Sequence, residues 1–309
     1  VPAYAVVFSN GNLNDFLSDL QFYTLCIAAQ KGMIIKMKFD GMLLCSDLDD
    51  TLLTTGDKRL TEENRRAIEY FMSEGGYFTF ATGRVPMGAR LILDIITPNA
   101  PMICFNGGAV YDFVNDEILW GVQLDKTAIR VMEYVEERFP DVGIEVCTDN
   151  NIYFCKENRI AEMHRFHENL PHNSLDYHNI FAPWKKVIFL SEEDKMPLLR
   201  KDLTHSPYAQ RFDFVQSSPN YYELLPKGVS KGAALLQLAD ILGVDRKKTI
   251  GIGDNYNDIG MIENAGIGVA VANAVPEARE AADFITVDND SNAIAAVISS
   301  LELGRIGFE

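Results

Sequence analysis

The sequence predicts an α/β protein in which a parallel sheet forms the core and a separate α+β unit is inserted into it. Two observations support this fold class. Short apolar runs alternate with helix-like segments in the first and last parts of the chain, which is typical of β-α-β units around a parallel sheet. Between about residues 122 and 225, short strand-like runs that meet at turn signals replace this alternation, which indicates an inserted unit.

The first β-α-β unit begins with the apolar run Met42–Cys45, which is short enough for a buried parallel strand. Thr61 is a suitable N-cap for the helix that follows. The run Tyr77–Ala81 is the second strand, and the connection between the two strands should be right-handed. A third strand is expected at Pro101–Phe105, so three strands should end at one edge of one sheet.

The inserted unit combines helix-like segments with short apolar runs. The expected helices are 126–138, 157–169 and 192–203. The expected strands are Gly143–Thr148, Ile152–Lys156, Lys186–Leu190, Arg211–Gln216 and Tyr221–Leu225. Turn signals at 149–151 and 217–220 join the first two and the last two of these strands, so both pairs are predicted to be hairpins.

The β-α alternation returns after Pro226, where Lys231 starts a helix that runs through Leu242. The further expected strands are Thr249–Ile252, Gly268–Val271 and Phe284–Thr286. The further expected helices pass through Met261 and Ile262, over Pro276–Ala282 and over Ala293–Leu301. We therefore expect a core formed by residues 37–121 and 226–309, an inserted domain formed by 122–225, and an N-terminal extension at 1–36.

The composition restricts the class of function. Apolar residues make up 47% of the 309 residues and charged residues 23%, as in an ordinary soluble globular protein. The net charge is −16 and no dense run of Lys or Arg is present, which disfavours nucleic-acid binding. No stretch reaches the roughly 18 uninterrupted apolar residues of a membrane helix, so no membrane association is expected. The five cysteines match no zinc or CxxC pattern, and a reducing cytoplasm is the expected location.

Carboxylates gather where predicted strands end. Asp47, Asp49 and Asp50 directly follow the first strand, and adjacent acids there are costly to bury unless a positive charge lies among them. Asp254 follows the strand Thr249–Ile252, and open parallel sheets bind ligands at the carboxyl ends of their strands. A divalent cation is the simplest candidate for this charge, although an acidic loop without chemistry would have the same composition.

The residue types at these strand ends fit phosphoryl transfer. This reaction needs an in-line nucleophile, a Mg²⁺ to offset charge, and fixed donors for the non-bridging oxygens. Asp47 can be the nucleophile and, together with Asp254, a metal ligand. Thr82 offers a hydroxyl and Lys231 a positive charge. Asp49, two residues beyond Asp47, can protonate the leaving oxygen as a general acid and later activate water.

Four segments, in order along the chain, resemble the four motifs of the haloacid dehalogenase superfamily. They are Asp47-Leu48-Asp49-Asp50-Thr51, Thr82-Gly83-Arg84, Lys231 within Gly228-Val229-Ser230-Lys231-Gly232, and Gly253-Asp254-Asn255-Tyr256-Asn257-Asp258. Asn106-Gly107-Gly108 and the large insertion resemble the Cof-type branch of the superfamily, which carries a C2-type cap of subclass IIB. The resemblance covers residues 40–302, which is most of the chain beyond the expected extension.

The resemblance implies a Rossmann-like core with a cap, and a Mg²⁺-dependent phosphatase that works through an aspartyl-phosphate. Its usual substrates are small phosphorylated metabolites such as sugar phosphates. The implied catalytic residues are Asp47 as nucleophile and Asp49 as acid/base. The implied metal ligands are Asp47, Asp254 and the backbone carbonyl of Asp49. The implied phosphate-binding residues are Thr82, Gly83, Lys231 and Asn257, while Asp258 would orient Lys231 or the metal's waters. Asp50 stands where glycine is commonest.

Other activities remain open at this point. A phosphomutase is the nearest alternative, because a related cap occurs in phosphomannomutases. A dehalogenase of the superfamily would lack Asp49, which is present. A non-catalytic regulator that binds phosphorylated metabolites would have lost at least one of Asp47, Asp49, Lys231 and Asp254, and all of them are intact.

Three further features each have two interpretations. His164 and His167 share a face of a predicted helix, which could bind a metal or simply be partly exposed. Arg84 could meet the substrate or cover the sheet edge. Lys227 could add to the phosphate site or remain solvated.

Overall fold

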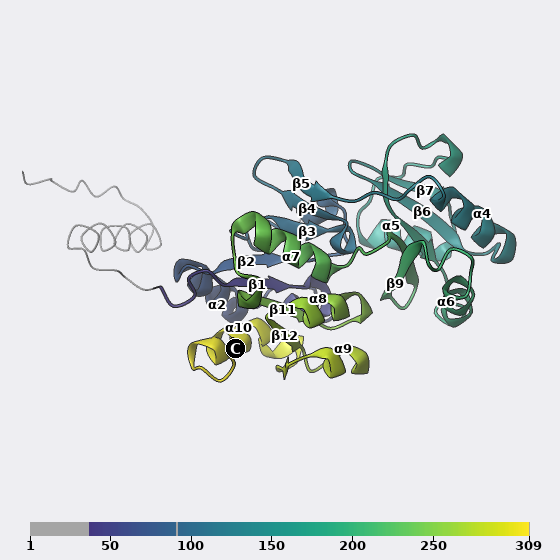
Figure 1. Cartoon of the computed structure of the whole chain (residues 1–309). Coiled ribbons are helices and arrows are strands. Elements are labelled where there is room, and N and C mark those ends of the chain that lie inside the picture. Colours follow the sequence, from purple (N-terminus) through teal and green to yellow (C-terminus); the bar gives the residue numbers. More distant parts are fainter. Residues whose placement is uncertain (1–36, 91, 309) are drawn as a thin grey trace, which may run out of the picture.

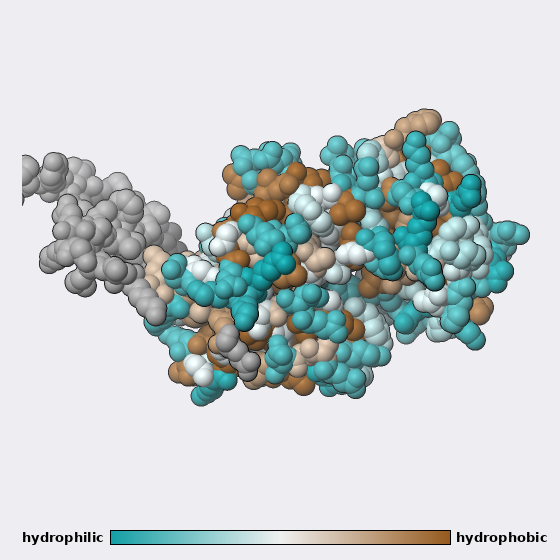
Figure 2. Space-filling model, in the orientation of Figure 1, coloured by the Kyte–Doolittle hydropathy of each residue, from teal (hydrophilic) through white to brown (hydrophobic). Residues whose placement is uncertain are grey.

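The computed structural model describes residues 37–90 and 92–308, so the predicted extension at 1–36 lies outside the described residues. Figure 1 shows two parts side by side: the strands within residues 43–80 and 249–270 belong to one part, and the strands within residues 143–218 belong to the other. Figure 2 shows that hydrophilic residues cover most of this face of both parts, with hydrophobic residues dispersed among them. Within the described residues, no helix combines the length and apolar character needed to cross a membrane.

The first sheet is parallel and has the strand order β13-β12-β11-β1-β2. Its strands are β1 (Leu43–Ser46), β2 (Tyr77–Phe80), β11 (Thr249–Gly253), β12 (Ile267–Ala270) and β13 (Phe284–Ile285). The interior strand β1, between β11 and β2, is buried along its whole length, as its continuous apolar run predicts. Because β1 and β11 are neighbours in register, with Ser46 opposite Ile252, the residues that follow these two strands emerge side by side.

Helices cover both faces of the parallel sheet. They are α2 (Glu62–Ser73), α3 (Pro86–Arg90), α7 (Lys231–Leu242), α8 (Ile259–Asn264), α9 (Pro276–Ala281) and α10 (Ala293–Glu302). Leu44 packs in the core that contains residues of α2 and α10, whereas Leu43 and Cys45 pack in the core that contains residues of α7 and α8. This alternation along β1 follows from the opposite directions of successive strand side chains. The predicted α/β class with a parallel-sheet core is thus confirmed.

The third predicted strand departs from the prediction. β3 (Met102–Cys104), β4 (Ala109–Asp112) and β5 (Glu117–Gly121) form a separate antiparallel sheet, and a single bridge from Ala81 to Ile103 links it to the parallel sheet. The chain reverses after β3 because Asn106 and Gly107 adopt positive φ angles of 55° and 96°. The expectation of one sheet for all three strands was therefore wrong, although β3 still ends beside Thr82, whose carbonyl accepts from the Asn106 amide at 3.0 Å.

The inserted unit is an antiparallel sheet with the order β7-β6-β8-β10-β9. Its strands are β6 (Gly143–Thr148), β7 (Ile152–Lys156), β8 (Trp184–Leu190), β9 (Phe212–Ser218) and β10 (Tyr221–Pro226). Its helices are α4 (Ala128–Arg138), α5 (Arg159–His167) and α6 (Met196–Thr204). Both predicted hairpins, β6–β7 and β9–β10, are confirmed.

One face of the inserted sheet packs against α4 and α6, where Val135 and Leu199 belong to a shared apolar cluster. The opposite face carries Glu145 and Lys186, which line a cavity. We propose that residues 122–225 form a cap domain over the core, because this unit has its own sheet and its own apolar cluster.

Candidate active site

A cavity of about 310 Å³ lies between the carboxyl ends of the parallel strands and the inserted sheet. Six of the predicted site residues line it: Asp47, Asp49, Thr82, Gly83, Asp254 and Asn257. The other two, Lys231 and Asp258, have fully buried side chains and contact the lining residues from behind. The structure therefore brings together all the residues that the sequence placed at one site.

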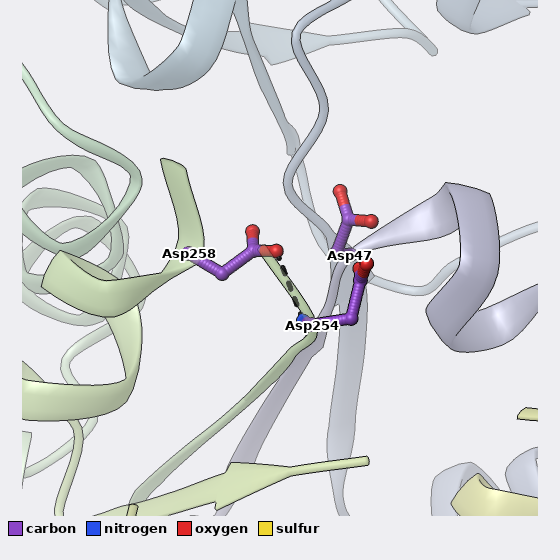
Figure 3. A group of neighbouring side chains, drawn as sticks. All are labelled: Asp47, Asp254 and Asp258. Atoms are coloured by element: carbon purple, nitrogen blue, oxygen red, sulfur yellow. Dashed lines mark hydrogen bonds between the residues drawn. The ribbon is translucent and has the colours of Figure 1, made fainter. Parts of the chain in front are cut away.

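Three aspartates form a compact acidic cluster at the base of the cavity. Oxygens of Asp47, Asp254 and Asp258 all lie within 4.8 Å of one another. Figure 3 shows Asp47 and Asp254 leaving the ends of adjacent strands, with Asp258 approaching from the segment that follows β11. Burial, with the charge of Asp258 as the next cause, raises the pKa of Asp254 to about 7.

Asp47 is in a similar electrostatic position. Burial raises the pKa of Asp47 well above its usual range, Lys231 opposes this shift, and Asp258 and Asp254 add to it. Burial raises the pKa of a carboxyl because it disfavours the charged form, and neighbouring carboxylates raise it further. Three aspartates lie here around the one ammonium of Lys231. The cluster thus has the electrostatic character of a cation site.

Lys231 supplies the positive charge that the protein itself contributes to this cluster. It occupies the first turn of α7, which begins where the Ser230 side chain accepts from the Ala233 amide. Its buried ammonium contacts Asp47 and lies 2.6 Å from Asp258. Although burial disfavours the charged form, the two aspartates raise the pKa of Lys231 above its usual range.

Asp258 is a supporting residue rather than a free ligand. One of its oxygens accepts from Lys231, and the other accepts from the backbone amides of Asp254 and Asn255 at 3.1 and 3.0 Å. This arrangement requires glycine at position 253, because a Cβ there would lie only 2.3 Å from the Cβ of Asp258. The predicted role of Asp258 in orienting Lys231 fits these contacts.

Asp47 and Asp254 each keep one carboxylate oxygen that accepts no hydrogen bond from a described residue. Lys231 contacts the other oxygen of Asp47, and the Thr51 hydroxyl donates to the other oxygen of Asp254 at 2.8 Å. Hard oxygen ligands of this kind suit Mg²⁺, which usually takes one or two carboxylates and keeps several waters. The residues present therefore fit the predicted metal.

Asp49 lies outside the cluster, with 41% of its side chain exposed at the cavity wall. Arg84 is 3.3 Å from its carboxylate and Lys58 is 3.7 Å away. This position leaves Asp49 accessible to a bound substrate.

Asp50 has a backbone conformation that explains why glycine is common at this position of the motif. Its φ is 59°, in the left-handed region, which glycine adopts readily and aspartate tolerates better than most residues. Its carboxylate pairs with Lys58 at 3.0 Å, and its carbonyl accepts from the Asn273 amide at 2.8 Å. Asp50 therefore stabilises the loop that carries Asp47 and Asp49.

Polar groups with no partner lie next to the acidic cluster. Asn257 donates to Asn106 at 3.0 Å, which leaves the buried Oδ1 of Asn257 and Nδ2 of Asn106 without a partner among the described residues. A Cβ at Gly83 would lie 3.1 Å from the Asn106 amide, so this glycine keeps the same corner open. Unpaired buried amide groups of this kind are suited to binding a polar ligand.

Asn106 is a site residue whose role the sequence did not predict. The available signal was Asn106-Gly107-Gly108. A Cβ at Gly107 would lie 2.1 Å from the Ser230 carbonyl oxygen, so only glycine lets this turn contact the start of α7.

The inserted sheet contributes a group of site residues that sequence reasoning missed. Lys186 has only 3% of its side chain exposed, and it donates to Glu223 and to the Gly83 carbonyl, each at 2.8 Å. Ser217 also donates to Glu223, and His164 lies 3.0 Å from Glu145. The available signal was the presence of charged residues within otherwise apolar strands.

The structure shows the position and the partners of each side chain that had two interpretations. His167 is exposed, whereas His164 is mostly buried and contacts Glu145, and the acidic cluster found among the described residues includes neither histidine. Arg84 lines the cavity and pairs with both Asp49 and Glu168. Lys227 is exposed and pairs with Asp213.

Comparison with known proteins agrees with this geometry. The sequence profile of the haloacid dehalogenase-like hydrolases matches residues 44–298. "Putative phosphatase YxeH" of Bacillus subtilis is 31% identical over 278 residues, which cover 85% of this chain and 99% of that protein. The 5-amino-6-(5-phospho-D-ribitylamino)uracil phosphatase YwtE of the same bacterium is 28% identical over 287 residues, covering 84% and 97%. The structure of the HAD subclass IIB sugar phosphatase BT4131 matches with a TM-score of 0.73 at 21% identity, covering 86% of this chain and 100% of that one.

Proposed function

The chain belongs to the haloacid dehalogenase-like hydrolases and is a phosphatase, and we propose that it hydrolyses small phosphorylated metabolites with Mg²⁺ through an aspartyl-phosphate on Asp47. The observation that carries this proposal is the buried cluster of Asp47, Asp254 and Asp258 around Lys231 at the end of the parallel sheet. Asp47, Asp254 and the backbone carbonyl of Asp49 would hold the metal. When bound, Mg²⁺ supplies positive charge that offsets repulsion between Asp47 and the phosphate.

In the first proposed step, a carboxylate oxygen of Asp47 forms a bond to phosphorus as the bond from phosphorus to the leaving oxygen breaks. Asp49 gives a proton to that leaving oxygen, because its side chain is exposed to the cavity. Lys231 contacts Asp47 and stabilises the negative charge there. Thr82, Gly83 and Asn257 would hold the non-bridging oxygens.

In the second proposed step, Asp49 takes a proton from water, and the resulting oxygen nucleophile attacks phosphorus. The bond between Asp47 and phosphorus breaks, which releases inorganic phosphate and restores the Asp47 carboxylate. Arg84 lies 3.3 Å from Asp49 and keeps this carboxylate at the cavity wall, so we assign Arg84 a positioning role.

The first test is the release of phosphate from an aryl phosphate such as p-nitrophenyl phosphate. We expect release that requires Mg²⁺ and stops in excess EDTA. Asp47→Asn should abolish turnover while keeping the fold, because the two side chains have nearly the same shape. Turnover by Asp47→Asn, or turnover in excess EDTA, would refute this mechanism.

The second test separates the two carboxylates by role. Asp49→Asn should slow both the protonation of the leaving group and the hydrolysis of the intermediate. We expect phosphate to accumulate covalently on Asp47 in this variant when a substrate with a good leaving group is used, which intact-mass measurement can detect. Unchanged turnover by Asp49→Asn would refute its assignment as the acid/base.

The size of the cavity supports a small phosphorylated substrate. Its volume of about 310 Å³ is at the lower end for ligand pockets. A screen of phosphorylated metabolites with phosphate detection tests this, and transfer of phosphate between positions on one sugar without net release would indicate a phosphomutase instead. A cytoplasmic location is also proposed, supported by the free thiols of the four cysteines in the described residues.

A further inference from the structure

We propose that Glu145, His164, Lys186, Ser217 and Glu223 form a subsite that binds the leaving group, and that this leaving-group subsite accepts hydroxyl or amine groups and rejects a second anionic group. The inference rests on the proposed phosphatase function and adds a substrate class to it. The selected substrates are phosphate monoesters of polyhydroxylated or amino-substituted molecules. Phosphate esters that also carry a carboxylate or another phosphate on the leaving group are excluded.

The strand register places these side chains on one face of the inserted sheet. Glu145 on β6 and Glu223 on β10 are both directly opposite Ile188 of the intervening strand β8. Directly paired residues share a face of a sheet, as do residues two apart on one strand, so Lys186 lies on this face too. Each of these residues lines the cavity that contains Asp47.

Hydrogen-bond acceptors are in excess on this wall. The Lys186 ammonium donates two hydrogen bonds within the protein, one to Glu223 and one to the Gly83 carbonyl. Glu145 is 1% exposed, and its described partners are His164 and the weakly donating thiol of Cys147. A carboxylate offers about four acceptor positions, so Glu145 and Glu223 retain acceptor capacity that hydroxyl or ammonium donors of a ligand can use.

This wall carries a net negative charge as well as an excess of hydrogen-bond acceptors. Two buried carboxylates, Glu145 and Glu223, lie near the single ammonium of Lys186. A second, fully ionised anionic group on the substrate would be brought against these buried carboxylates, and it could donate no hydrogen bond to them. Juxtaposed like charges of this kind oppose binding strongly.

Arg84 does not reverse this charge balance. Its guanidinium lies between Asp49 and Glu168, at 3.3 and 2.9 Å, so its charge is already shared by two carboxylates. Among the described residues that line the cavity, Lys186, Arg84 and His164 therefore each already contact a carboxylate, whereas the phosphate that reacts is served by the separate group around Lys231.

The test compares three phosphate esters of similar size: glucose 6-phosphate, glucosamine 6-phosphate and 6-phosphogluconate. We expect 6-phosphogluconate to be hydrolysed with a kcat/KM at least about tenfold below the value for glucose 6-phosphate, and glucosamine 6-phosphate with a kcat/KM no lower than that value. The net charge of −16 also opposes anions, but salt at about 0.5 M screens this long-range field and not a buried contact. Discrimination that disappears in salt would overturn the inference.

A matched pair of variants tests whether Glu145 causes the discrimination against 6-phosphogluconate. Glu145→Gln removes one carboxylate of the subsite, and Glu157→Gln removes the carboxylate of a second Glu–His pair, Glu157 with His172, that does not line the cavity. The two variants have the same net charge. We expect Glu145→Gln to narrow the discrimination against 6-phosphogluconate by at least about threefold, and Glu157→Gln to leave it unchanged.

Equal discrimination in the two variants would overturn the proposal, as would hydrolysis of the aryl phosphate with none of the three sugar esters. If Glu145→Gln does not fold, the salt experiment on the natural protein decides alone. Absence of release from all the esters, the aryl phosphate included, would refute the proposed phosphatase mechanism itself, which distinguishes the two failures.

Discussion

Two buried lysines lie on opposite sides of the cavity, Lys186 in its wall and Lys231 behind the aspartates that line it. Their surroundings differ, and the difference indicates which lysine serves the reaction and which joins the two parts of the molecule. Lys231, from the core, contacts two aspartates, Asp47 and Asp258. Lys186, from the inserted sheet, contacts one glutamate, Glu223, and one backbone carbonyl. Lys231 therefore contacts one carboxylate more than Lys186 does, and with Asp254 also present this side of the cavity is suited to a further cation and a phosphate.

The contact between Lys186 and the Gly83 carbonyl joins the inserted unit to the phosphate-binding corner of the core. Arg84 makes a second link of this kind to Glu168. Both links start from adjacent residues of the core, so a change in the position of the inserted unit would be transmitted to Gly83 and Arg84. We infer that Lys231 acts on the reacting group, whereas Lys186 acts on the fit between the two parts.

Replacing Lys231 should give the largest effect on activity. Lys231→Met keeps much of the side-chain volume but leaves Asp47 and Asp258 without their ammonium partner. We expect kcat/KM for every substrate, the aryl phosphate included, to fall by roughly 10²–10³ or more. Lys247→Met, which changes an exposed lysine, is the matched control. Steady-state kinetics measures the effect, and more than a tenth of the original activity in Lys231→Met would contradict it.

Magnesium should stabilise the protein more at high pH than at low pH, because metal binding requires an ionised Asp254. The pKa of Asp254 is raised from 3.8 to about 7, so the folded protein holds this proton more tightly than the unfolded chain does. Without metal, the contribution of the Asp254 proton to the free energy of unfolding is therefore largest below pH 3.8. It decreases as the pH rises towards 7 and stays constant above pH 7. We expect the Tm increase on adding Mg²⁺ to be greater at about pH 8 than at about pH 6.

Thermal unfolding at both pH values, with and without Mg²⁺, measures this difference. Asp254→Asn is the control, since it removes both the titration and the ligand and should show little Mg²⁺ stabilisation at either pH. An equal Tm increase at both pH values in the natural protein would refute the link between Asp254 and the metal.

Replacing Lys186 should affect stability more than chemistry. Lys186→Met leaves Glu223 buried with Ser217 as its remaining described donor, and breaking a buried ion pair from one side costs about 3–5 kcal/mol. We expect the double variant Lys186→Met/Glu223→Gln to recover part of this loss, because the uncompensated charge is removed. Chemical denaturation measures both variants, and the fall in kcat/KM for the aryl phosphate should be smaller than for Lys231→Met. An equal or larger fall would show that Lys186 takes part in the chemistry.

The contrast between the lysines also shows what the sequence can predict. Lys231 was predictable because it begins a helix in a recognisable segment, and because Asp47 and Asp254 each follow an apolar run that reads as a buried strand. The carboxyl ends of parallel strands meet at one edge, so strand order along the chain is enough to bring such residues together.

Lys186 and its partners were not predictable in this way. Glu145 and Glu223 come from separate antiparallel strands, and a charged residue in such a strand is more often on a solvated face. Only the register of β6, β8 and β10 places them on one face, and only the packing of the whole unit turns that face towards Asp47. The antiparallel pairing of β3 with β4 was missed for a local reason, since the reversal at Asn106 uses a left-handed backbone that the apolar pattern does not reveal.

The exposed pair of Lys58 and Asp50 should give the smallest effect and so provides a reference for the two buried lysines. About two-fifths of each side chain is exposed, at 41% and 42%, and exposed ion pairs contribute about 0–1 kcal/mol. Asp50→Gly loses this pair but relieves the left-handed φ of 59°. We therefore expect its free energy of unfolding to change by less than about 1 kcal/mol.

Asp50→Val loses the same pair and adds a β-branched side chain at positive φ, so it should be destabilised by roughly 1–2 kcal/mol or more relative to Asp50→Gly. Denaturant unfolding of the two variants compares them directly, and equal stability would mean that the left-handed backbone conformation does not determine which residue fits this position.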